Sequence, residues 1–166
     1  SDYRFEIHKS DYLLFLAKAS WKVKNVDGAI RIARRASVPL RIVGGSRWWL
    51  PHWRGIHWEG MLGGLRKQEL LAKSRGLLFP VLWHEPFGLA VVEAMLSGTP
   101  VLASSWGSLP ELVSSESGFL CQSESDFVEK VARLGELNPG RCRDWALSRF
   151  HYQQMAKGYL SYYEKI

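Results

Sequence analysis

The sequence predicts an α/β protein with a doubly wound, parallel sheet of six strands. Six short, apolar runs alternate along the chain with amphipathic stretches of about 10 to 13 residues, a pattern typical of repeated strand–helix–strand units. The chain has 166 residues, 46% of them hydrophobic, which is enough for one domain with a full core and short for two. Right-handed crossovers and the strand order 3-2-1-4-5-6 are the default for such a sheet.

The N-terminal quarter supplies two strands and a helix. Residues 12–17 are continuously apolar, as expected for a strand buried on both faces. Residues 26–37 carry apolar side chains at helical spacing, and Asn25 or Asp27 can cap the start of this helix. Residues 39–43 form the second predicted strand, which two glycines end.

The third and fourth strands are predicted over residues 55–59 and 76–81, and both begin at a glycine. A short helix over residues 66–74 joins them. Residues 46–54 stand where a doubly wound sheet would normally carry a helix. With nine residues that include Pro51, this stretch leaves little room for one.

The rest of the sheet and its covering helices follow in the same alternation. A helix over residues 87–97 is stopped by a glycine, and the fifth strand covers residues 100–103. A short helix over residues 109–114 leads to the sixth strand, residues 118–121. Two further helical stretches complete the chain. They cover residues 125–134 and 141–166.

Two carboxylates, Glu85 and Glu93, mark the apolar segment EPFGLAVVEAMLSGTPVLAS after the fourth strand. Pro86 suits a first helical turn, and Gly88 lets a ligand approach the backbone closely. The first amides of the helix lack helical acceptors and carry the positive end of its dipole, so they form a site for phosphate or a sugar hydroxyl.

Each acid alone is most often a solvated surface residue, but the pair with a glycine between them favours a ligand. A carboxylate among valines and alanines, such as Glu93, is costly unless it is paired. The two hydroxyls of a ribose would pair with it as a bidentate donor. Glu85 would then mark the other end of a nucleotide-sugar, with the diphosphate over the helix start.

The loop after the first strand carries three cations, Lys18, Lys22 and Lys24, which can neutralise a diphosphate leaving group. The net charge of +6 and the pI of about 9.5 favour anionic partners, but the charges are spread along the chain, so we do not expect a nucleic-acid partner. No G-x-G-x-x-G or P-loop lysine motif is present, which argues against a hydride-transferring enzyme. No cluster of His, Cys and acidic residues has ligand spacing, so neither a metal nor another cofactor is expected.

These motifs resemble those of the family 4 group of retaining glycosyltransferases with the GT-B fold. The segment from Glu85 to Glu93 is similar to the E-x7-E motif of that group. YLLFLAKASWKVKNVDGAIRIA resembles its first strand, cation loop and helix. GMLGGLRKQELLAKSRGLLFP, GSLPELV and SGFLC resemble its base-binding loop and later elements. The resemblance covers nearly the whole chain.

The resemblance implies roles for individual residues. The donor sugar would lie against Glu85 and the amides of Phe87, Gly88 and Leu89, and the ribose on Glu93. The diphosphate would lie between two lysines of the cation loop. The resemblance implies that these are Lys18 and Lys24, with Lys22 as the alternative to Lys24. The nucleobase would lie near three residues after the third strand, namely Gly60, Met61 and Leu62.

The chain departs from the family pattern in three places. The cation loop is one residue longer, which makes Lys22 the alternative to Lys24. Ala17-Lys18 stands where the family usually has Gly-Arg, which keeps the charge but loses the bidentate fork of arginine. The stretch after Gly45 lacks the usual long helix, so the base pocket is expected to differ there.

The resemblance further implies that the whole chain, 1–166, is one half of a GT-B fold. Residues 1–11 would be the incoming linker and residues 139–166 the C-terminal helices of a donor-binding, Rossmann-like domain. The resemblance implies that the N-terminal acceptor-binding domain is not part of these 166 residues, so a sugar, lipid-linked or other acceptor would need that domain or a partner chain. The donor would be a nucleoside-diphosphate sugar of UDP or GDP type.

The expected location is the cytoplasm. The positive net charge also allows peripheral association with the cytoplasmic face of a membrane. Cys121 and Cys142 are expected to be free thiols in a reducing compartment. No apolar run reaches the roughly 18 residues of a membrane span, and no leader for secretion opens the sequence.

Two other interpretations remain open at this point. The chain could be an inactive nucleotide-sugar binding module, or a subunit that works only with a partner chain. It could also be a non-catalytic interaction scaffold that binds a protein or a membrane through its tryptophan-rich segment, which contains Trp48, Trp49 and Trp53. The scaffold interpretation predicts no nucleotide binding.

Overall fold

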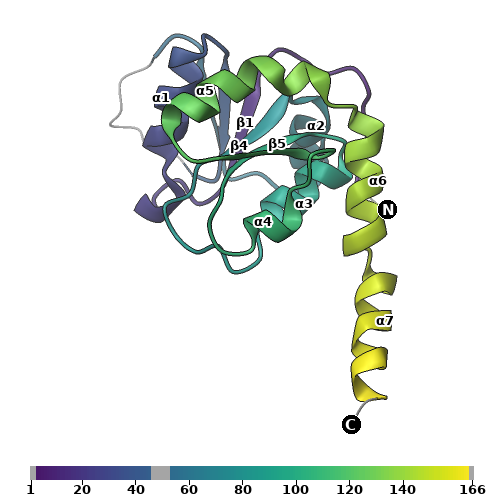
Figure 1. The fold of residues 1–166 in the computed structure, drawn as a ribbon. Helices are drawn as coiled ribbons and strands as arrows, with labels where there is room; N and C mark the ends of the chain where they lie inside the picture. The colour runs from purple at the N-terminus through teal and green to yellow at the C-terminus, as the bar shows by residue number, and fades with distance from the viewer. Residues whose placement is uncertain (1–2, 46–52, 165–166) are drawn as a thin grey trace.

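The computed structural model describes residues 3–45 and 53–164, which form a central sheet with helices on both faces (Figure 1). All six strands are parallel, in the order β3-β2-β1-β4-β5-β6, which confirms the predicted topology. The strands are β1 Leu13–Leu16, β2 Leu40–Val43, β3 Ile56–Gly60, β4 Gly76–Phe79, β5 Val101–Ser104 and β6 Gly118–Cys121. The strand order reverses between β1 and β4, which defines the switch point of the sheet.

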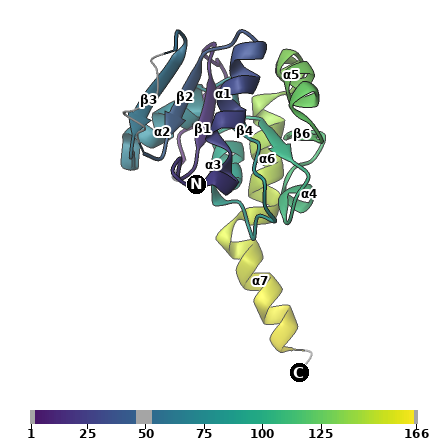
Figure 2. The same cartoon turned by 90° about the vertical axis from the view of Figure 1, so that its left-hand side faces the viewer.

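Helices pack on the two faces of this sheet in separate sets (Figure 2). The helices are α1 Val26–Arg35, α2 Gly64–Lys73, α3 Leu89–Leu96, α4 Leu109–Leu112, α5 Glu124–Arg133, α6 Pro139–Phe150 and α7 Tyr152–Tyr163, with short 3₁₀ helices η1 Lys22–Lys24 and η2 Leu134–Glu136. Buried side chains of α1 and α5 cluster on one face, and those of α2, α3 and α6 on the other.

The alternation of side chains along β1 explains why that strand is apolar throughout. Leu13 and Phe15 belong to the core beneath α1 and α5, whereas Leu14 belongs to the core beneath α2 and α3. All three side chains are fully buried. A strand that is covered on both faces needs an apolar residue at every position, as the sequence suggested.

Several element boundaries differ from the predictions. The predicted helix over residues 87–97 begins only at Leu89, because Gly88 takes a left-handed conformation with φ 87°. Pro86 therefore precedes the helix and does not occupy its first turn. The helix α2 begins two residues earlier than predicted, and η1 was not predicted at all. The stretch at residues 46–52, with Trp48 and Trp49, lies outside the described residues.

The C-terminal tail, which was predicted to be helical over residues 141–166, forms two helices. The break falls at His151, whose backbone is extended with φ −68° and ψ 140° and whose side chain accepts a hydrogen bond from the Gln153 amide at the start of α7. The helix α6 packs against α3, whereas α7 leads away from the domain and exposes its tyrosines (Figures 1 and 2). Without a core contact to align it, α7 need not continue the axis of α6.

The segment before β1 is fastened to the ends of two helices by Lys9. Its Nζ donates hydrogen bonds to the carbonyls of Ala72 (2.7 Å) and Ser97 (3.3 Å) and to Oγ1 of Thr99 (3.2 Å). These carbonyls lie at the C-terminal ends of α2 and α3, where helices leave acceptors unpaired. Burial lowers the pKa of Lys9 to about 8.

The two cysteines are buried and free, as expected. Burial raises the pKa of both thiols to about 12, so neither is a reactive thiolate at neutral pH. Within residues 3–45 and 53–164, no helix is both long enough and apolar enough to cross a membrane.

Candidate functional site

A pocket of about 370 Å³ opens at the switch point, between the loop after β1 and the loop after β4. Ligands of doubly wound sheets bind at this place, outside the carboxyl ends of the strands. The pocket is mostly apolar with a few convergent polar groups. Its lining residues are Leu16, Ala17, Trp21, Lys24, Phe79, Trp83, Glu85, Pro86, Phe87, Gly88, Leu89 and Ala90.

The polar centre of the pocket is an ion pair between Lys24 and Glu85. The Lys24 Nζ lies 2.6 Å from Oε2 of Glu85, and the two side chains are 12% and 9% exposed. The structure therefore joins two predicted site residues that lie 61 positions apart. A buried pair of this kind requires good geometry and further hydrogen bonds, because both charges have lost water.

Two backbone contacts hold the loops that carry this pair. The Leu82 amide donates to the Val23 carbonyl at 2.8 Å, which joins the loop after β4 to the loop after β1. Asn25 has a left-handed backbone, and its side-chain oxygen accepts from the Gly28 amide at the start of α1. The side-chain nitrogen of Asn25, Nδ2, also donates to the Pro80 carbonyl, so the residue that caps α1 is bonded to the segment directly after β4.

Trp83 is a site residue that the sequence reasoning missed. Its Nε1 donates a 2.9 Å hydrogen bond to Oε2 of Glu85, the same oxygen that binds Lys24. The Lys24 ammonium also lies 4.4 Å from the centre of the Trp83 ring. The local signal in the sequence is the place of Trp83 two residues before Glu85.

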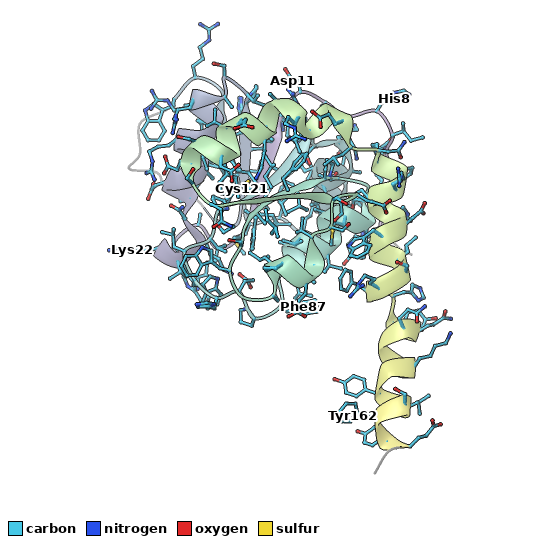
Figure 3. The ribbon with its side chains drawn as sticks, in the orientation of Figure 1. His8, Asp11, Lys22, Phe87, Cys121 and Tyr162 are labelled. Carbon is cyan, nitrogen blue, oxygen red and sulfur yellow. The ribbon has the colours of Figure 1, made fainter. Side chains whose placement is uncertain are left out.

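The start of α3 presents free amides to the pocket. The first amides that bond to the turn belong to Val91 and Val92, and both donate to the Gly88 carbonyl, at 2.9 and 3.2 Å. The preceding amides, of Gly88, Leu89 and Ala90, have no acceptor within the helix by their position. These three residues line the pocket at the place where the sequence predicted an anion site. Phe87 lies next to this helix start, at the lower side of the domain in Figure 3.

The loop after β5 clamps the segment that leads into α3. The Ser108 amide donates to the Glu85 carbonyl and the Ser108 hydroxyl to the Phe87 carbonyl, both at 2.9 Å. Gly107 has φ 65°, and a Cβ at this position would lie 2.4 Å from the Glu85 carbonyl oxygen. A glycine is therefore required for the two loops to pack so closely.

Glu93 already has two protein partners, which the sequence reasoning did not foresee. Its Oε1 accepts from the Lys67 Nζ at 2.7 Å and from the Tyr3 hydroxyl at 3.2 Å. Burial and the Glu93 charge raise the pKa of Tyr3. The Glu93 carboxylate is thus paired, as expected from the free-energy cost of an unpaired charge in an apolar segment. Its Oε2 accepts no hydrogen bond from the described residues.

The other predicted residues lie around the pocket rather than in its lining. Lys18 is exposed, with its Nζ 4.9 Å from the ring centre of the pocket residue Trp21. Lys22 is exposed and points outward from η1 (Figure 3), so of the two alternatives only Lys24 faces Glu85. The three residues predicted for the nucleobase lie outside the pocket lining, at the end of β3 (Gly60) and directly after it (Met61 and Leu62). Met61 is 78% exposed.

Gly60 is nevertheless connected to the cation loop through Gly44, which directly follows β2. Its carbonyl accepts from the Gly44 amide at 2.8 Å, and the Gly44 carbonyl accepts from the Ala19 amide at 2.9 Å. Among the described ranges of the chain, no group of three or more His, Cys, Asp or Glu side chains could hold a metal ion.

Comparison with known proteins gives a family match. The family model described as Glycosyl transferases group 1 matches residues 10–136. The chain is 34% identical, over 122 residues, to an MMP alpha-(1->4)-mannosyltransferase of Mycolicibacterium hassiacum, a match that covers 66% of this chain and 29% of that protein. It is also 34% identical, over 96 residues, to the human GDP-Man:Man(3)GlcNAc(2)-PP-Dol alpha-1,2-mannosyltransferase, covering 51% of this chain and 20% of that protein.

Solved structures show the same fold. AviGT4, a glycosyltransferase involved in avilamycin A biosynthesis, superposes with a TM-score of 0.84 at 25% identity, over 98% of this chain and 54% of that one. Anabaena HepE in complex with UDP superposes with a TM-score of 0.75 at 21% identity, over 92% of this chain and 49% of that one. The chain thus spans about half of these structures and between a fifth and a third of the curated relatives.

Proposed function

Because the chain belongs to the group 1 glycosyl transferases, we propose that it is the donor-binding part of a retaining, metal-independent hexosyltransferase. The donor is a nucleoside-diphosphate sugar of UDP or GDP type. In the reaction, the bond between the anomeric carbon and the diphosphate breaks, the diphosphate leaves with the bonding electrons, and an acceptor oxygen that loses its proton takes its place.

One observation carries this proposal, namely that the Lys24–Glu85 pair faces the free amides of α3 across a single pocket. Amides at a helix start and a lysine stabilise the negative charge that develops on a departing diphosphate. In the proposal, Glu85 and the amides of Phe87, Gly88 and Leu89 hold the sugar.

The remaining parts of the donor are assigned to the residues around the pocket. Lys18 and Lys24 bind the diphosphate, and Glu93 binds the ribose through the oxygen that Lys67 and Tyr3 leave open. The residues after β3 bind the nucleobase. The link from Gly60 through Gly44 to the cation loop supports this last assignment.

We also propose that the acceptor is held by a second domain, in the same protein or in a partner chain. Proteins that resemble this chain are at least about twice as long as the matched part. Transfer requires the acceptor atom to lie about 3 to 3.5 Å from the sugar carbon, and one wall of a cleft does not fix that distance. The acceptor is a sugar, a lipid-linked group or another hydroxyl compound. We place the reaction in the cytoplasm, free or at the membrane surface.

The decisive experiment is a thermal-shift panel of UDP, GDP, ADP and their sugars with the 166-residue chain. A ligand at 100 times its Kd stabilises the folded state by about 2.7 kcal/mol, which corresponds to about 5–10 °C in Tm. We expect one nucleotide series to give such a shift. If no member of the panel changes the Tm, the proposed function is wrong and the scaffold interpretation gains support.

The same chain should show no measurable sugar transfer when it is incubated alone with labelled donors and a range of acceptors. Binding without transfer is the expected result, because the 166 residues would supply only one wall of the proposed cleft. Acceptor-dependent transfer by this chain alone would contradict the need for a second domain, although donor binding would still be supported.

Glu93→Gln should weaken the binding of the nucleoside diphosphate by about 1 to 3 kcal/mol, measured by calorimetry. The substitution replaces a charged acceptor by a neutral one at the proposed ribose site. Lys67→Gln serves as the control, because it removes the ion pair but keeps the carboxylate. If Glu93→Gln leaves the affinity unchanged, Glu93 does not contact the ribose.

A further inference from the structure

The carboxylate of Glu85 is held from one side only. Both of its donors, the Lys24 ammonium at 2.6 Å and the Trp83 indole at 2.9 Å, bind Oε2. Oε1 accepts no hydrogen bond from the described residues. A carboxylate can accept about four hydrogen bonds, so Oε1 remains available to a hydroxyl in the pocket that Glu85 lines.

The indole of Trp83 contacts both members of the ion pair, each with a different part of the ring system. Its N–H edge, which is electropositive, donates to the Glu85 carboxylate. Its face, which is electronegative, lies 4.4 Å below the Lys24 ammonium. The pair therefore keeps one geometry only if a side chain supplies an edge donor and an aromatic face at the same place. Among natural side chains, tryptophan provides both with the largest face.

The place of Trp83 in the chain supports this role. It stands between β4 and the Pro86-Phe87 turn, half-buried, two residues before Glu85. The backbone of Glu85 is fixed independently by the loop after β5, through the bond from the Ser108 amide to the Glu85 carbonyl. With the backbone held by Ser108, the remaining freedom of Glu85 is rotation of its side chain, and the indole bond removes that freedom.

We propose that Trp83 is a positioning residue that aims Oε1 of Glu85 at a hydroxyl of the donor sugar. This inference rests on the proposed function, since it assumes that Glu85 contacts the sugar. It makes a specific statement beyond it: the N–H donor of Trp83 contributes to recognition of the sugar and not of the nucleotide. The contribution passes through Glu85, so it should vanish when Glu85 can no longer serve as a charged acceptor.

The test compares the affinities of the intact nucleotide-sugar and of the matching nucleoside diphosphate, measured by calorimetry on the 166-residue chain. Trp83→Phe keeps an aromatic face for Lys24 but removes the N–H donor. We expect the affinity for the nucleotide-sugar to fall about tenfold, as for the loss of one hydrogen bond to a charged group, and that for the nucleoside diphosphate to stay within about twofold. In the background of Glu85→Gln, Trp83→Phe should change neither affinity by more than about twofold, because coupled residues are not additive.

Trp145→Phe is the matched control. Trp145 is also half-buried and also donates an indole hydrogen bond, but to the carbonyl of Leu112 at the end of α4, and neither residue lines the pocket. Its substitution should leave the ratio of the two affinities unchanged. Circular dichroism of each variant establishes that it is folded. If Trp83→Phe does not fold, Trp83→His replaces it in the test. Histidine retains an N–H donor on an aromatic ring, so this variant should keep the higher affinity for the nucleotide-sugar than for the nucleoside diphosphate.

Each outcome has one meaning. Equal losses for the nucleotide-sugar and the nucleoside diphosphate, or additive effects of the Trp83 and Glu85 substitutions, overturn the positioning role while leaving the proposed function intact. If the unmodified chain binds neither compound, the proposed function fails and the role of Trp83 fails with it.

Discussion

Gly107→Ala is expected to lower the free energy of unfolding by about 3 kcal/mol and to abolish most donor binding. The new Cβ would lie 2.4 Å from the carbonyl oxygen and 2.5 Å from the nitrogen of Glu85, both backbone atoms that cannot rotate away. Overpacking of this kind costs about 1–3 kcal/mol, and the left-handed conformation at φ 65° adds about 1–2 kcal/mol for a residue with a Cβ. Thermal denaturation should show a Tm lower by about 6–12 °C.

The affinity for the nucleotide-sugar should fall at least about tenfold in the same variant, because relief of the clash moves Glu85 away from the pocket. Gly55→Ala is the control for backbone strain alone. Gly55 has φ 83°, but the nearest atom to a new Cβ is Cα of Pro39 at 3.9 Å, an ordinary contact. We expect Gly55→Ala to lower the free energy of unfolding by about 1–2 kcal/mol and to leave the affinity for the nucleotide-sugar unchanged. If the two variants behave alike, the loop after β5 does not position Glu85.

Lys24→Ala should reduce the affinity for the nucleoside diphosphate by about 10- to 100-fold while changing that for the free nucleoside by less than about threefold. A charge-assisted hydrogen bond contributes about 1.5–3 kcal/mol, and here its loss also leaves the Glu85 carboxylate to repel the diphosphate. The affinity of the unmodified chain for the diphosphate should also fall as salt is added, because salt screens the attraction. Titration calorimetry at two salt concentrations measures both effects.

The chain offers its own control in Lys22, two positions earlier in η1 and exposed. Lys22→Ala should change the affinity for the diphosphate by less than about threefold, and Lys18→Ala should give an intermediate loss. Equal losses for Lys22→Ala and Lys24→Ala would mean that the general charge of the loop, and not a specific cation, attracts the ligand. If Lys24→Ala reduces the affinity for the free nucleoside as much as that for the nucleoside diphosphate, Lys24 does not bind the diphosphate.

The sequence predicted the sheet well because each strand had a clear local signal. Residues 12–17 had to be apolar on both faces, and β1 is indeed buried on both. The order of the strands is the usual order of a doubly wound sheet with right-handed crossovers. The cation loop and the start of α3 could be placed together for the same reason, since both follow strands that flank the switch point.

Contacts between distant side chains could not be predicted in this way. Nothing local to Glu93 shows that Lys67, which is 26 positions away, or Tyr3, which is 90 away, binds its carboxylate. The start of α3 was placed too early because a proline usually marks the first helical turn, whereas here the left-handed Gly88 sets the boundary. The break at His151 has no glycine or proline to reveal it and depends on where the contacts of α6 end.

The central position of β1 has a consequence for the order in which the molecule folds. β1 pairs with β2, whose residues follow within about 30 positions, and with β4, where Leu13 meets Gly76. Because pairings between distant segments form slowly, we expect β1, α1 and β2 to assemble before β4 joins them. Lys24 belongs to the early part and Glu85 follows the strand that joins late. The ion pair can close only when the two halves of the sheet have met, so donor binding would appear in a refolding experiment after most of the helical signal has returned.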